Sequence, residues 1–169
     1  MAGSPFVVGV GPLLRVPGDR RREVRRGPLP GLAVTGAAVP DDAEVEVDVM
    51  LDGVPGGVVA TGTVTAPWRG QCRRCLADAG GTVAVEVREV FEEAGDPEQT
   101  YPLRGDRIDL APLARDAVLL ELPLAPLCRD DCSGLCPVCG ADRNQAPCAC
   151  DPTAGDPRWA ALDALRPQR

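Results

Sequence analysis

The chain has 169 residues, a length that suits one domain with appendages. Its formal net charge is −7, and an acidic surface repels phosphate backbones, which argues against broad non-specific nucleic-acid binding. The sequence has no histidine, the commonest general base and a frequent ligand of open catalytic zinc, so we expect a protein that is not an enzyme.

The N-terminus, MAGSPFVVGVGPLLRVPG, lacks the basic start and long apolar run of a secretory signal. No stretch approaches the roughly 18 apolar residues needed to span a bilayer. We therefore expect a cytoplasmic protein without a membrane partner. Thiols stay reduced in that compartment, so eight cysteines in short, clustered spacings indicate metal ligands in preference to disulfides.

Residues 1–40 are rich in Gly, Pro and Arg, and we predict an extended, loosely held, basic segment with room for a short strand. Between Arg15 and Arg26 the only acids are Asp19 and Glu23. This run is a candidate phosphate contact, although charge runs are usually just solvated. Its candidate nucleic-acid contacts are Arg20, Arg21, Arg22, Arg25 and Arg26.

Residues 41–127 carry the patterns of a sheet and a helix, and we predict that they form the core. In AEVEVDVML, apolar residues alternate with charged ones, and this period of two predicts a half-buried strand. Its apolar positions are Val45, Val47, Val49 and Leu51. The following DGVPGG predicts a turn, and residues 58–66 predict the partner strand of a hairpin.

A third strand is predicted over residues 82–93, with an irregularity near Glu89, so that Cys72 and Cys75 would lie at the turn of an antiparallel meander. Residues 92–107 are polar and rich in turn formers, which predicts a loop.

The best helix candidate is IDLAPLARDAVLLELPL, with Asp109 as cap, Pro112 in the first turn and Pro123 as the stop. We expect its apolar stripe to consist of Leu113, Ala117 and Leu120.

Residues 128–169 are predicted to form a cysteine cluster followed by a short helix over residues 156–165. Cys136-Pro-Val-Cys139-Gly has the form of a zinc knuckle, because two cysteines separated by two residues in a tight turn present both sulfurs to one metal ion. Cys148 and Cys150 follow shortly afterwards and complete a set of four. Spacing alone therefore predicts one zinc site from Cys136, Cys139, Cys148 and Cys150.

The remaining cysteines allow a second zinc site from Cys72, Cys75, Cys128 and Cys132, which would join the strand hairpin to the segment after the helix. Spacing leaves two alternatives open, in which Cys132 joins the C-terminal site or Cys128 stays a free thiol. An iron-sulfur cluster could use the same thiolates.

A redox dithiol at Cys72 and Cys75 is a further alternative, since flanking arginines lower a thiol pKa. Such motifs open a helix after a strand, whereas this one lies in a meander. Beside it, Trp68, Arg69, Arg73 and Arg74 form a basic and aromatic cluster. Arg73 and Arg74 either offset the negative charge of the thiolates or contact nucleic acid.

Three passages together resemble the YceD-like family of large ribosomal RNA subunit accumulation proteins: CRRCL from Cys72, LPLAPLC ending at Cys128, and C-x3-C-SGLCPVCG-x7-CAC ending at Cys150. The resemblance covers most of the chain after about residue 40. It supports the division of the cysteines into two sets of four, and it implies a role in 23S ribosomal RNA accumulation and large-subunit biogenesis. It implies no catalytic residue.

We therefore expect an α+β protein with a small antiparallel β-sheet or partly closed barrel, one packed helix, and a cysteine-rich C-terminal segment that binds zinc. The hypothesis is a non-enzymatic factor that binds two zinc ions and assists 50S assembly by contacting 23S rRNA, a pre-50S particle or an assembly partner. In an alternative, the acidic strand around residues 44–52 holds a basic ribosomal protein.

Overall fold

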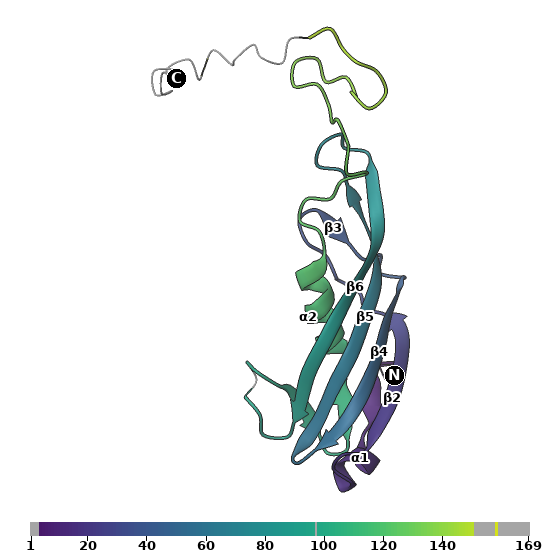
Figure 1. Ribbon diagram of the computed structural model, residues 1–169, viewed down its shortest axis with the longest axis vertical. Helices are drawn as coiled ribbons and strands as arrows, with labels where there is room; N and C mark the ends of the chain where they lie inside the picture. Colours follow the sequence, from purple (N-terminus) through teal and green to yellow (C-terminus); the bar gives the residue numbers. More distant parts are fainter. Residues whose placement is uncertain (1–3, 97, 151–157, 159–169) are drawn as a thin grey trace.

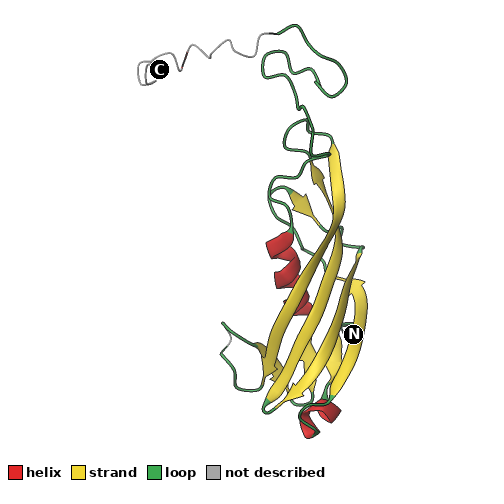
Figure 2. Ribbon diagram, in the orientation of Figure 1, coloured by secondary structure: helices red, strands yellow, loops and turns green. Residues whose placement is uncertain are grey.

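The computed structural model describes residues 4–96, 98–150 and 158 of the chain (Figure 1). Strands dominate the described residues, and the two α-helices among them are short (Figure 2). The strands are β1 (Val7–Gly9), β2 (Arg20–Pro28), β3 (Ala37–Ala38), β4 (Glu44–Val54), β5 (Gly57–Gln71), β6 (Asp78–Glu92), β7 (Tyr101–Arg104) and β8 (Arg107–Asp109), and the helices are α1 (Gly11–Arg15) and α2 (Ala111–Glu121). The residues named for the predicted C-terminal helix, Asp156, Trp159, Leu162 and Leu165, lie outside the described residues.

The strands form one curled sheet, a half-barrel, in the order β1-β8-β7-β6-β5-β4-β2, with β3 pairing to β5. All neighbours are antiparallel except β6 and β7, which are parallel. The meander β4-β5-β6 was predicted from the sequence and is confirmed, with Val64 facing Val47 on one side and Val85 on the other. The β5–β6 pairing continues without interruption from Phe91 to Asp78, so the irregularity expected near Glu89 is absent from it.

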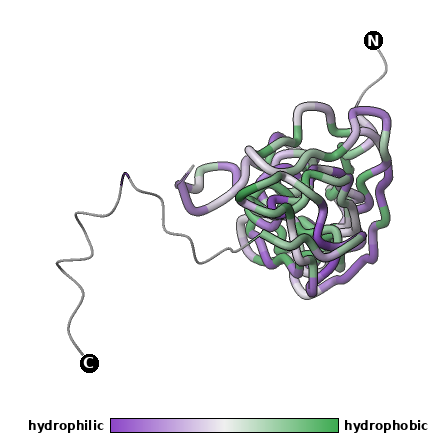
Figure 3. Tube along the Cα trace, turned by 90° about the horizontal axis from the view of Figure 1, so that it is seen from above, coloured by the Kyte–Doolittle hydropathy of each residue, from purple (hydrophilic) through white to green (hydrophobic). Residues whose placement is uncertain are grey.

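Alternation along the strands creates the core. The apolar residues of β4 point to the inside of the curl, where Val45, Val47, Val49 and Leu51 are at most 1% exposed. Seen from above, hydrophobic segments gather in the middle of the body and hydrophilic ones at its rim (Figure 3). Helix α2 packs against β5 and β6 and covers the inner face, whereas α1 packs against β4 and β5 at the lower end of the sheet in Figure 1.

Helix α2 forms where it was predicted, but the expected stripe was wrong. Leu113 is buried, whereas Leu120 is 88% exposed. The buried face follows steps of four residues through Leu110, Ala114, Val118 and Leu122, because these positions lie one above the other on a helix. The N-cap position is Leu110 and not the predicted Asp109, and Leu110 makes no side-chain cap hydrogen bond. Asp109, one residue earlier, still accepts a hydrogen bond from the backbone amide of Ala111 through its Oδ1 at 3.0 Å.

The N-terminal region, expected to be loosely held, is an integral part of the sheet. Strand β2 has nine residues, all paired with β4. The region also contributes buried apolar side chains to the same core as β4: Phe6, Val8, Val10, Leu13, Leu29 and Leu32. Phe6, Val8 and Val10 alternate over only one short strand, and the other buried residues are widely spaced along a segment rich in Gly and Pro. The long-range pairing of β1 with β8 and of β2 with β4 therefore reveals their role.

The stretch expected to be a loop over residues 92–107 contains β7 and the start of β8. A two-residue turn, Gly105-Asp106, joins these strands, with Gly105 at a positive φ of 61°. Tyr101 of β7 packs its ring against Phe91 of β6, with ring centroids 5.4 Å apart. Its hydroxyl donates a hydrogen bond to Asp116 of α2 at 2.8 Å, which ties this hairpin to the helix.

The terminal strands β1 and β2 approach each other across the opening of the half-barrel. Arg21 Nη2 donates a hydrogen bond to the carbonyl oxygen of Gly9 at 2.6 Å. Gly27 lies so close to Pro5 that a Cβ would be 2.6 Å from the proline ring. Side chains, in place of a ladder of backbone hydrogen bonds, therefore bridge this seam.

Candidate metal centres

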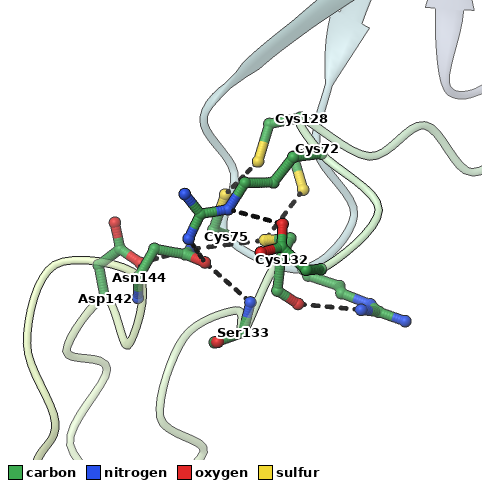
Figure 4. Close-up of polar contacts among 10 residues, drawn as sticks. Cys72, Cys75, Cys128, Cys132, Ser133, Asp142 and Asn144 are labelled. Atoms are coloured by element: carbon green, nitrogen blue, oxygen red, sulfur yellow. Dashed lines mark hydrogen bonds and ion pairs between the residues drawn. The ribbon is translucent and has the colours of Figure 1, made fainter.

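The first cysteine cluster lies at the far end of the two longest strands. Strands β5 and β6 extend past the end of β4 and are joined by a turn that carries Cys72 and Cys75. After α2 the chain runs back to this turn and brings Cys128 and Cys132 against it (Figure 4). This candidate metal site therefore connects parts of the chain more than fifty residues apart, as the sequence predicted.

The sulfur atoms of this cluster have the spacing of a single tetrahedral ion. Cys72 Sγ and Cys132 Sγ are 3.7 Å apart, Cys75 Sγ and Cys128 Sγ are 3.6 Å apart, and all four lie within 4.8 Å of one another. Zn–S bonds of about 2.3 Å at tetrahedral angles hold sulfurs about 3.8 Å apart. A disulfide would require about 2.05 Å. The geometry thus fits a metal ion.

The second cluster consists of Cys136, Cys139, Cys148 and Cys150, whose sulfur atoms also lie within 4.8 Å of one another. Cys136 is buried, Cys139 is exposed, and the other two are half-buried. The structure therefore brings together the same two sets of four cysteines that the sequence and the resemblance predicted. Cys132 does not join the C-terminal set, and Cys128 is not separate from the other cysteines.

The two cysteine turns have the same backbone design. In the first, the amide of Cys72 donates to the carbonyl of Ala77 at 2.8 Å, and the amide of Leu76 donates back to Cys72 at 2.9 Å. In the second, Cys136 and Ala141 are bonded in the same way at 2.8 Å, and Gly140 donates to Cys136 at 2.9 Å. Leu76 and Gly140 occupy matching positions with φ of 62° and 74°. Each turn thereby aims its two sulfurs at one point.

One thiol in each cluster is prepared to ionise. Burial opposes the charge on Cys72, but amides of Cys128, Arg74 and Cys75 outweigh it and lower its pKa to about 6. Amides of Cys139 and Val138, with the side chain of Cys148, lower the pKa of Cys136 to about 6.

The accumulating negative charge then works against further ionisation. In the first cluster the neighbouring Cys75 side chain, together with burial, raises the pKa of Cys128 to about 12. Contact with Cys139 does the same for Cys150. A bound cation removes this repulsion, so the donor set of each cluster fits a divalent metal ion.

Both clusters lie within the part of the chain that the sequence comparisons match to a known family. Residues 60–166 match the family model described as large ribosomal RNA subunit accumulation protein YceD, a span that includes both cysteine clusters. The chain belongs to the YceD family.

Relatives of this YceD-family chain include full-length and partial matches. An uncharacterised protein of Mycobacterium tuberculosis strain H37Rv is 36% identical over 188 aligned positions, which cover 98% of this chain and 87% of that protein. An uncharacterised protein of Mycobacterium leprae is 34% identical and covers 97% of this chain and 79% of its own length. The chloroplastic YCED homolog 1 of Arabidopsis thaliana, named as a large ribosomal RNA subunit accumulation protein, is 34% identical over 40% of this chain and 21% of its own. No solved structure matches.

The arginine run of this YceD-family chain faces acids of the neighbouring strand. Arg20, Arg22 and Arg26 of β2 form ion pairs with Asp52, Asp48 and Glu46 of β4, respectively. Arg21 and Arg25 alternate with them and share Glu23. The basic segment and the acidic strand, which the sequence offered as surfaces for two different partners, therefore largely neutralise each other.

Arg73 and Arg74 lie in the turn at the tip of the β5–β6 hairpin. Arg74 Nη1 donates to the carbonyl oxygen of Cys132 at 2.9 Å, and its own carbonyl accepts from the amide of Leu135. Arg74 therefore braces the first cluster. Arg73 is bound through its backbone amide to Pro126, and its side chain is exposed. The indole of Trp68 packs partly buried against the core.

Sequence reasoning missed Asn144, whose side chain contacts Cys132 Sγ at 3.4 Å (Figure 4). Asparagine between two pairs of metal-ligating cysteines gives no pattern that distinguishes it from a loop residue. Of the described residues, neither helix is long and apolar enough to cross a membrane.

Proposed function

We propose that each cysteine cluster binds one zinc ion and that both ions are structural. The separations of 3.6 and 3.7 Å between sulfurs support this assignment, since four thiolates at tetrahedral distances close the coordination shell. A multi-iron cluster is larger than one ion and would hold the four sulfurs farther apart. With its four positions taken by protein, such an ion has no site for substrate.

We further propose that the chain is a non-enzymatic, cytoplasmic factor in ribosome biogenesis. It would support 23S rRNA accumulation and 50S assembly by binding rRNA or a pre-50S particle. The observation that carries this proposal is the family match over residues 60–166, a span that includes both cysteine clusters. Arg73, exposed on the turn that the first cluster would hold rigid, supplies a positive charge for phosphate.

Two alternatives have less support. A basic ribosomal protein held by the acidic strand would have to displace the arginines of β2 from Asp48 and Asp52. A thiol oxidoreductase should open a helix with its C-x-x-C motif, whereas Cys72 to Ala77 form a turn that leads directly into β6.

Co-sedimentation tests the proposal. The full-length protein, loaded with zinc, is run through sucrose gradients at low salt with pre-50S particles, mature 50S subunits or 30S subunits. We expect association with the pre-50S particle and none with the 30S subunit. Absence of association with any large-subunit particle would contradict direct binding. If the protein still captured a basic ribosomal protein after nuclease treatment, the alternative in which the acidic strand holds such a protein would be favoured.

A further inference from the structure

Asn144 belongs by sequence to the second cysteine cluster and by contact to the first. It lies in the loop between Cys139 and Cys148, which the second cluster closes. Its side-chain Nδ2 nevertheless lies 3.4 Å from Sγ of Cys132, a member of the first cluster (Figure 4). The loop of the second cluster therefore directly contacts a candidate metal ligand of the first cluster.

The orientation of the Asn144 amide is fixed by its other partners. Its Oδ1 accepts hydrogen bonds from the backbone amide of Ser133 at 2.8 Å and from Arg129 Nη2 at 2.9 Å. Both of those groups can only donate, so the oxygen must face them and the NH2 group must face Cys132. The same NH2 group donates to Asp142 Oδ1 at 2.8 Å. The amide thus presents a donor to the sulfur.

The loop that carries Asn144 is held by short-range contacts to the chain just before Cys136. Leu135 and Asp142 form an antiparallel bridge, and the amide of Arg143 donates to the carbonyl of Gly134 at 3.0 Å. The loop begins and ends at the cysteines of the second cluster. An ion that joins these cysteines therefore closes the loop and limits the positions that Asn144 can take.

We propose that Asn144 is a positioning residue for the metal ion of the first cluster and that it couples the two metal sites. An ion in the second cluster orders the loop, and the ordered loop brings the Asn144 donor to Cys132. Four thiolates around one divalent ion leave two excess negative charges, and a donor aimed at a sulfur stabilises them. Hydrogen bonds to metal ligands are typically worth about 10- to 100-fold in affinity. By linkage, the first ion strengthens the second site by the same factor.

Cobalt(II) titration of the full-length chain, followed by displacement with zinc, measures each site because cobalt thiolates absorb strongly. Cys75→Ser removes the first cluster and gives the affinity of the second alone. Cys136→Ser disables the second cluster and gives the affinity of the first cluster for the ion. We expect Asn144→Ala to lower first-site affinity about tenfold or more. Asn144→Asp, which keeps the acceptor but turns an oxygen toward the thiolate, should lower it at least as much.

The matched control is Arg143→Ala, which changes an exposed side chain of the same loop and keeps the backbone contact to Gly134. It should leave both affinities as in the unmodified chain. Cys136→Ser should weaken the first site to about the level of Asn144→Ala, and combining the two should bring no further loss, because both remove the same contact. The loop lies outside the main core, so the sheet should stay folded in every variant.

The coupling is refuted if Asn144→Ala binds cobalt at the first site as tightly as Arg143→Ala does. It is equally refuted if the losses caused by Cys136→Ser and Asn144→Ala multiply. The inference rests on the proposed metal binding. Two ions bound independently would overturn the coupling alone, whereas a protein that binds no ion at either cluster would overturn both.

Discussion

The guanidinium group of Arg22 on β2 donates two hydrogen bonds to the carboxylate of Asp48 on β4. Nε lies 2.8 Å from one carboxylate oxygen and Nη2 lies 2.5 Å from the other. This fork belongs to a row of ion pairs across the outer face of the sheet, and such bidentate geometry is specific to arginine. The most basic stretch of the sequence is thereby occupied within the molecule.

Nucleic-acid binding should consequently depend on the turn between β5 and β6 and only weakly on β2. Arg73→Ala should weaken association with pre-50S particles or 23S rRNA and reduce the salt slope of the binding constant by about one. Arg22→Ala should change neither, because its charge is already balanced by Asp48. Binding measured by filter retention at several salt concentrations checks both. Equal losses from the two variants would mean that the pairs on β2 open to admit phosphate.

The Arg22–Asp48 pair should also give the protein a pH-dependent contribution to stability. Hydrogen bonds from Arg22 hold the pKa of Asp48 below its usual 3.8, so the contribution is present above that value and lost as the pH falls through the lowered pKa. Asp48→Asn should therefore lower the thermal midpoint slightly at pH 7, and the difference should vanish in strong acid. Asp42→Asn, at an exposed acid outside this row of ion pairs, is the control. A difference that grows in acid would contradict this account.

Metal content should follow the two clusters. At saturating zinc the unmodified chain should hold two ions, and Cys72→Ser and Cys136→Ser should each hold one, because each removes a ligand from a different set of four. Elemental analysis of the dialysed proteins gives the stoichiometry. One ion in the unmodified chain would rule out the division into two sites.

Removal of the metal should loosen the tip and leave the sheet intact. The buried cysteines Cys72, Cys75 and Cys132 form a small cluster of their own, separate from the main core. A chelator should therefore speed hydrogen exchange at residues 72–77 and 128–146, while β4 stays protected. Exchange followed by mass spectrometry resolves these segments. Loss of protection in β4 would show that the core also depends on the metal.

The buried face of α2 can be tested with two leucines. Leu113 is 1% exposed, and Leu113→Ala should cost about 2–5 kcal/mol of unfolding free energy through lost burial and a residual cavity. Leu120 is 88% exposed, and Leu120→Ala should change stability by no more than about 0.5 kcal/mol. Denaturant unfolding measures both. A large cost at Leu120 would restore the stripe expected from the sequence.

Local patterns could be predicted and long-range partners could not. The period of two around Val47 and the spacing of Cys136 and Cys139 depend only on neighbouring residues, so the sequence was sufficient for the meander and the knuckle. The strand around Arg22 depends on an acidic partner more than twenty residues away, and Asn144 depends on where a loop folds back. The two choices for the helix stripe differ by one residue, and packing on β5 and β6 decides between them.

The seam between β1 and β2 has a consequence for behaviour at high concentration. A sheet with two free ends normally offers unpaired backbone groups to other molecules, which invites aggregation. Here Arg21 occupies the Gly9 carbonyl, and Pro5 blocks the approach beside Gly27. The two edge strands thus cover each other, and the protein should resist strand-to-strand polymerisation although its sheet does not close into a barrel.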